Sequence, residues 1–145
     1  NDPTGIQISG KSGDNLYIFK SIDKYLEMPE LKNFVTSFVQ SCGVPISQIL
    51  VEPKASGKSL VQLLRRETRY NVSEIKTNFV RYSKIERARA SSPFIEGGRV
   101  FIVKDNWNDA FLQQVSTFPN AKHDEHIDVT SYAIERNLIN NFFVV

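Results

Sequence analysis

The order of strand-like and helix-like segments is the feature that most constrains the fold of this chain. Residues 5–10 and 16–22 carry the alternating, β-branched and aromatic pattern of strands, and Gly13 lies in a turn-like segment between them, which favours a hairpin. Helix-like and strand-like segments then interleave. This order predicts an α/β fold with a mixed central sheet flanked by helices on both faces. We expect further strands over residues 46–52, 72–76 and 99–103, and helices over 29–42, 56–68, 82–90, 106–116 and from about 123 through 134.

Length and composition favour one domain that covers residues 1–145. The apolar content of 41% suffices for a packed core, and Leu31, Phe34, Val35, Phe38 and Val39 recur at the spacing of one buried helix face. The chain has one cysteine, which excludes an internal disulfide. A net charge of +2 does not mark a strongly basic nucleic-acid binder, but it permits basic patches beside an acidic site.

A cluster of acids and imidazoles lies at the start of the last predicted helix, where His123, Asp124, Glu125, His126 and Asp128 fall within six positions. On a helix, Asp124 and Asp128 share one face, so their charges repel. Removing one acid is therefore expected to leave stability unchanged or to raise it. A divalent cation would turn the repulsion into attraction, because Mg²⁺ and Mn²⁺ prefer carboxylate oxygen. The simpler alternative is a solvated helix start, where acids are favoured.

A second candidate acid, Glu52, closes an apolar strand. Ligands gather at the carboxyl ends of strands in α/β sheets. Two-metal phosphodiester cleavage uses ions about 3.5–4 Å apart. Such a site needs carboxylates from several elements, and Glu52 with Asp124 and Asp128 would supply them. The alternative is an acid at the edge of a loop.

Gly57, Lys58 and Ser59 precede a helix and invite comparison with a phosphate-binding loop. That motif requires a further glycine five positions before Gly57, where this chain has Glu52, so the ATP-binding pattern fails. Lys58 could still contact a DNA phosphate at the helix N-terminus. A plain capping turn is the alternative.

A basic stretch surrounds Tyr82, and its members Lys84 and Arg87 share a helical face. A basic stretch with an aromatic residue could follow a phosphate backbone. An ordinary solvated helix is the alternative.

Three motifs in this order resemble a known family. They are VEPKASGKSLVQLLR at 51–65, KIERARASSPFIEGGRVFI at 84–102 and FPNAKHDEHIDVTSYAI at 118–134, with a helix that contains tryptophan before the last. Together they resemble the C-terminal nuclease domain of the large terminase subunit of tailed bacteriophages, over roughly residues 5–136. The resemblance implies an RNase H-like fold and a metal-dependent endonuclease that cuts concatemeric DNA during genome packaging.

The resemblance also implies roles for individual residues. The strand-ending acid of the family matches Glu52, and its final acidic motif matches His123 to Ala133. Glu52 and Asp128, assisted by Glu125 or Asp124, would hold Mg²⁺ or Mn²⁺, as two ions. The candidates for contact with DNA phosphates are Lys54, Lys58, Lys84 and Arg87.

This chain departs from the family pattern at three places. Glu125 stands where the family has the second aspartate of a pair, and Val129 stands where alanine is usual. The first catalytic aspartate of the family precedes the hairpin, whereas this sequence starts at Asn1, and Asp2 aligns better with a loop acid. We therefore expect the first strand and one metal ligand to lie upstream, in a larger protein with an ATPase domain.

The resemblance implies double-stranded DNA as the main partner. For the full-length protein, the resemblance also implies an ATPase domain, a small terminase subunit and the portal as partners. It implies the host cell cytoplasm as the location. Two alternatives stay open: a non-catalytic RNase H-like module that binds DNA or a protein partner, and a resolvase- or integrase-like nuclease.

Overall fold

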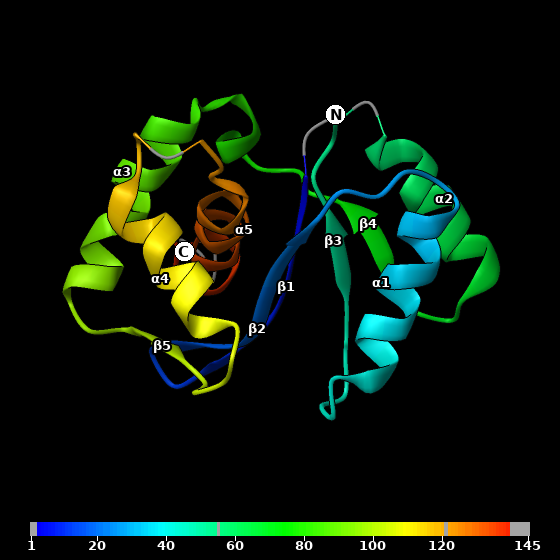
Figure 1. Cartoon of the computed structure of the whole chain (residues 1–145), viewed down its shortest axis with the longest axis horizontal. Helices are drawn as coiled ribbons and strands as arrows, with labels where there is room; N and C mark the ends of the chain where they lie inside the picture. Colours follow the sequence, from blue (N-terminus) through cyan, green and yellow to red (C-terminus); the bar gives the residue numbers. More distant parts are fainter. Residues whose placement is uncertain (1–2, 55, 121, 140–145) are drawn as a thin grey trace, which may run out of the picture. The chain divides into compact units, whose positions relative to one another are not determined.

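The computed structural model of the chain describes residues 3–54, 56–120 and 122–139 (Figure 1). Asp2, which the resemblance aligns with a loop acid, lies outside these residues. The chain divides into two compact units. The first unit comprises the described parts of residues 1–25 and 82–145, and the second comprises those of residues 26–81. Each unit has its own hydrogen-bonded sheet.

The sheet of the first unit is mixed. Strands β1 (Thr4–Ser12) and β2 (Asn15–Lys24) form the predicted antiparallel hairpin. Its turn contains Gly13 at a φ of 59°, where a side chain would be strained. Strand β5 (Val100–Ile102) pairs in parallel with β2, which is the middle strand of the three. The predicted α/β architecture with a mixed sheet is confirmed, but the strands of the described residues form two hydrogen-bonded sheets rather than one central sheet.

A bulge in β2 changes which of its side chains face the helices of the first unit. The register shifts by one residue after Ile8 of β1, and Phe19 is the extra residue of β2. Before the bulge, Leu16 and Ile18 enter the hydrophobic core. Beyond it, the alternation moves by one position, so that Ser21 is buried on that face as well.

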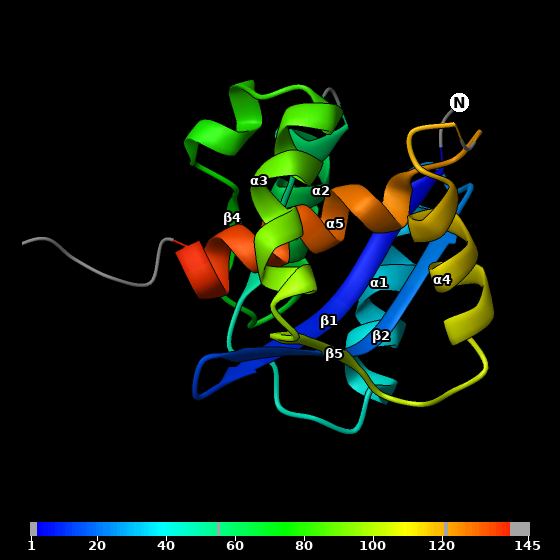
Figure 2. The same cartoon turned by 90° about the vertical axis from the view of Figure 1, so that its left-hand side faces the viewer.

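Helix α5 (Glu125–Ile134) lies across β1 and β2 in the first unit (Figure 2). It continues as a π-helical segment, η2 (Glu135–Ile139). Helices α3 (Lys84–Glu96) and α4 (Asn108–Thr117) pack against α5. The buried core that these elements share consists of Leu16, Ile18, Trp107, Phe111 and Ile134.

The second unit has two parallel strands, β3 (Ile49–Val51) and β4 (Val72–Glu74). Helix α2 (Gly57–Glu67) packs against both strands, and α1 (Glu30–Ser41) packs against α2. A short 3-10 helix, η1 (Asn78–Arg81), ends the unit. Four members of the apolar helix face predicted from the sequence are buried on α1, namely Leu31, Val35, Phe38 and Val39, whereas Phe34 is half-buried. Helix α2 buries Leu60, Val61 and Leu64.

Two differences from the sequence-based prediction concern element length. Helix α3 extends to Glu96 rather than ending near residue 90, and it accommodates Pro93 in its interior. A capping box between Ser83 and Glu86 fixes the start of this helix. The later strands have three residues each and are shorter than predicted. Among the described residues, no helix combines the length and the apolar character needed to cross a membrane.

Candidate functional site

The first turn of α5 is held against β1 by close backbone contact. A Cβ atom added to Gly5 would lie 2.7 Å from the carbonyl oxygen of Glu125 and 3.1 Å from Cγ1 of Val129. Because a real Cβ does not come this near to a backbone oxygen, only glycine allows the approach. The position of the acidic cluster therefore depends on a residue that lies far away in the sequence.

Buried hydrogen bonds also fix the orientation of α5. Nδ1 of His126 lies 2.7 Å from the hydroxyl of Ser21 on β2, and the backbone N–H of His126 donates to Oε1 of Gln114 on α4 at 2.7 Å. On β1, Nε2 of Gln7 donates to the hydroxyl of Thr130 at 2.9 Å. Burial lowers the pKa of His126, which favours the neutral imidazole. The helix is thus joined to three other elements by polar contacts.

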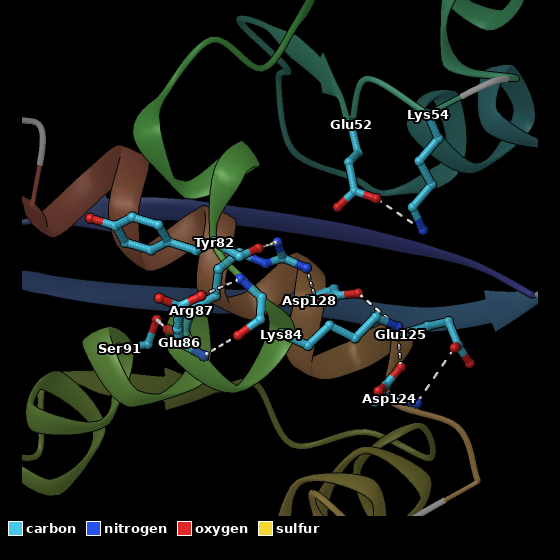
Figure 3. Close-up of polar contacts among 11 residues, drawn as sticks. Glu52, Lys54, Tyr82, Lys84, Glu86, Arg87, Ser91, Asp124, Glu125 and Asp128 are labelled. Atoms are coloured by element: carbon cyan, nitrogen blue, oxygen red, sulfur yellow. Dashed lines mark hydrogen bonds and ion pairs between the residues drawn. The ribbon is translucent and has the colours of Figure 1, made fainter.

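Asp128 projects from α5 toward α3, and its two carboxylate oxygens have different cationic partners (Figure 3). Its Oδ1 accepts a hydrogen bond of 2.8 Å from Nη2 of Arg87. Its Oδ2 lies 3.2 Å from Nζ of Lys84. Only 9% of the Asp128 side chain is exposed, so these partners offset much of the cost of burying its charge.

Lys84 bridges two of the predicted metal ligands. Its ammonium group lies 2.6 Å from Oδ1 of Asp124 and 3.2 Å from Oδ2 of Asp128. Burial acts to lower the pKa of Lys84, but the hydrogen bond to Asp124 and the charge of Asp128 outweigh it and raise the pKa. The repulsion expected between the two acids is therefore offset within the protein itself.

Arg87 is buried and held on several sides. Its Nη1 donates a hydrogen bond of 2.6 Å to the carbonyl oxygen of Tyr82, and its guanidinium lies over the ring of Tyr132, 5.1 Å from the centroid. A planar guanidinium held in this way is suited to orienting a carboxylate such as that of Asp128. Contact of Arg87 with DNA stays a prediction.

Glu125 is the least well satisfied acid of the cluster. Its Oε1 is buried and accepts no hydrogen bond from the described residues. This oxygen lies 3.5 Å from Nδ1 of His123, which makes an ion pair only when that imidazole is protonated. Burial, assisted by the negative charge of Asp124, raises the pKa of Glu125. A further cation would therefore stabilise the ionised form of this side chain.

The second unit presents Glu52 at the end of β3, in a tight connection to α2. The backbone N–H of Lys54 donates to the carbonyl oxygen of Glu52 at 2.8 Å, and the Lys54 ammonium lies 2.9 Å from Oε1 of Glu52. A Cβ on Gly57 would overlap that same carbonyl oxygen. The glycine of the Gly57-Lys58-Ser59 motif is therefore required for close approach of α2 to β3. The side chains of Lys54 and Lys58 are exposed, and their contact with DNA stays a prediction.

The donor set of the first unit fits a hard cation in part. The carboxylates of Asp124 and Asp128 already converge on one positively charged group, the Lys84 ammonium. In the part of the chain that the structure describes, no group of three or more histidine, cysteine or acidic side chains is arranged to hold a metal ion. The carboxylates of Asp124 and Asp128 are thus brought together, and metal binding by Glu52, Asp124, Glu125 and Asp128 stays a prediction.

Sequence reasoning missed the pairing of the basic and acidic motifs. Lys84 and Arg87 were assigned to DNA, whereas the structure pairs them with Asp124 and Asp128. The available signal was the spacing, because Lys84 and Arg87 are three residues apart and the two acids are four residues apart, and each spacing places both side chains on one helix face. Nothing in the local pattern identified the hydrogen bond between Ser21 and His126.

Comparison with protein families places the chain in a known family. A family model described as the terminase RNaseH-like domain matches residues 44–137, which is more than half of the chain. The match includes all three motifs noted in the sequence. Comparisons with curated proteins and with solved structures gave no match. The predicted RNase H-like fold is confirmed by the family match, and the chain belongs to the family of terminase RNase H-like domains.

Proposed function

We propose that the chain is a metal-dependent DNA endonuclease domain that cuts concatemeric viral DNA during genome packaging. Its family is a nuclease-type module of DNA packaging. The observation that carries the proposal is the convergence of the Asp124 and Asp128 carboxylates on a single cation in a domain of this family.

Each acidic residue has a role in this proposal. Glu52 and Asp128 would hold Mg²⁺ or Mn²⁺, with Asp124 or Glu125 assisting. When bound, two such ions activate a water and stabilise the leaving oxygen of a phosphodiester. Arg87 holds Oδ1 of Asp128 and so fixes the direction of the carboxylate. Through these buried contacts Arg87 acts as a positioning residue for Asp128.

The exposed lysines would hold the DNA backbone. Lys54, Lys58 and Lys84 have partly or fully exposed side chains that could reach phosphate oxygens. Phosphate contacts carry no sequence information, so duplex binding should be tolerant of sequence. In a longer protein, an ATPase domain, a small terminase subunit and the portal would be its partners, in the cytoplasm of the host cell.

Nicking of supercoiled plasmid in Mn²⁺ tests this proposal. Glu52→Gln and Asp128→Asn should each abolish nicking, because the acids act through the metal. For the same reason, a chelator should abolish nicking by the unchanged protein. Glu67→Gln is the matched control, since it removes an exposed acid that pairs with Lys32 on α1. Cleavage that survives both Glu52→Gln and Asp128→Asn would show that the site is assigned wrongly.

A non-catalytic module for DNA binding is the second candidate. It is favoured by the ion pairs that already neutralise Asp124 and Asp128, and by the lack of a three-ligand group among the described residues. Such a module would bind duplex DNA equally well with Mn²⁺ and with chelator, and it would not nick plasmid under either condition.

A further inference from the structure

We propose that Lys84 is an exchangeable resident cation, which occupies the carboxylates of Asp124 and Asp128 while no metal is bound and leaves them when a divalent ion binds. This inference rests on the proposed function, since it concerns the same carboxylates. It adds a role for a residue that the sequence assigned only to contact with DNA.

The two cations beside Asp128 differ in how readily they can leave. The side chain of Lys84 is 43% exposed, whereas that of Arg87 is 8% exposed. Arg87 is also held by the Tyr82 carbonyl oxygen and the Tyr132 ring. Lysine carries a compact charge on a flexible stem, whereas the arginine fork is rigid. Lys84 is therefore the partner that can be exchanged, and Arg87 is the one that stays.

The backbone at Lys84 can remain in place during such an exchange. Lys84 is the first residue of α3, directly after the N-cap residue Ser83. The Ser83 hydroxyl accepts a hydrogen bond of 3.1 Å from the backbone N–H of Glu86, and the Glu86 carboxylate accepts one of 2.8 Å from the backbone N–H of Ser83. This capping box holds the first turn of the helix. Rotation of the Lys84 side chain alone can thus release both carboxylates.

Exchange would couple metal binding to DNA binding. While Lys84 bridges the acids, its charge is neutralised inside the protein and competes with any other cation for the same oxygens. Once displaced, the ammonium is available to a phosphate. Metal should therefore strengthen duplex binding and duplex should strengthen metal binding by the same factor, because linkage is reciprocal.

Mn²⁺ binding, measured by calorimetry on the whole chain without DNA, tests the inference. Lys84→Met removes the charge and keeps the length of the side chain. It should bind Mn²⁺ roughly threefold to thirtyfold more tightly than the unchanged protein, since two partly exposed ion pairs no longer compete. Lys84→Gln should bind more tightly as well, and it provides a second variant if Lys84→Met does not fold.

Two further variants serve as controls. Lys84→Arg keeps a cation at the site and should retain an affinity near that of the unchanged protein. Lys32→Met breaks an ion pair of 2.8 Å with Glu67 in the second unit and should leave the affinity for Mn²⁺ unchanged.

The outcomes separate this inference from the proposed function. If the unchanged protein binds Mn²⁺ but Lys84→Met and Lys84→Gln bind it equally or more weakly, the inference is overturned and the nuclease proposal stands. If neither the unchanged protein nor the folded Lys84 variants bind Mn²⁺, both are overturned. Tighter binding by the two neutral variants, abolished when Asp128→Asn is added, is the result that we expect.

Discussion

At the scale of single residues, the contribution of Asp128 to stability depends on the cations that it pairs with more than on its neighbours in the sequence. Like charges four residues apart suggested that removing an acid would leave stability unchanged or raise it. The structure supports the opposite prediction for Asp128, because this side chain is buried and pairs with both Arg87 and Lys84. Removing one partner of a buried ion pair is destabilising, since the remaining charge stays buried without a partner.

We therefore predict that Asp128→Asn lowers the free energy of unfolding by about 1–3 kcal/mol, because a buried guanidinium would then face a neutral amide. Asp124→Asn should cost less than about 1 kcal/mol, since 23% of the Asp124 side chain is exposed and its partner Lys84 is more exposed still. Urea denaturation measures both values. Equal stability of Asp128→Asn and the unchanged protein would contradict the ion-pair account.

At the scale of helices and strands, the contact between α5 and β1 determines where the acids lie. Gly5→Ala should destabilise the protein by about 1–3 kcal/mol and reduce Mn²⁺-dependent nicking, because α5 must shift to admit the methyl group. Gly10→Ala is the matched control on the same strand, where a Cβ would meet only the Phe19 ring at an ordinary 3.4 Å. Thermal melting and plasmid nicking of both variants check this. A Gly5→Ala protein as stable and active as Gly10→Ala would contradict it.

Local pattern predicted most of the elements but not how their side chains pair. The β1–β2 hairpin and the apolar stripe of α1 were predictable because their periods and turn residues are local signals. The extension of α3 past Pro93 was not, since proline ordinarily signals a helix end. The bridge from Lys84 to Asp124 spans forty residues and exists only because α3 packs on α5. Pairing of this kind depends on tertiary structure, which a local pattern does not contain.

At the scale of the whole molecule, a net charge of +2 makes DNA binding depend on a few local contacts rather than on the overall field. We predict that Lys54→Ala with Lys58→Ala reduces the magnitude of the negative slope of log affinity against log salt by about 1.8 on duplex DNA, or about 0.9 for each phosphate that a lysine no longer neutralises. The decrease in affinity should be similar for unrelated sequences. Arg66→Ala with Arg69→Ala removes the same charge from other positions of the second unit and is the control. An unchanged slope for the lysine pair would remove both lysines from the DNA path.

A crystal structure of the chain soaked in Mn²⁺, with the ions located by anomalous scattering, tests most directly whether the carboxylates at the start of α5 bind the metal of a packaging nuclease. We expect Mn²⁺ at the Asp128 carboxylate, with Arg87 still bonded to Oδ1 and the Lys84 ammonium displaced. A soaked crystal with no Mn²⁺ at Asp128, in which Lys84 still bridges Asp124 and Asp128, would contradict the claim.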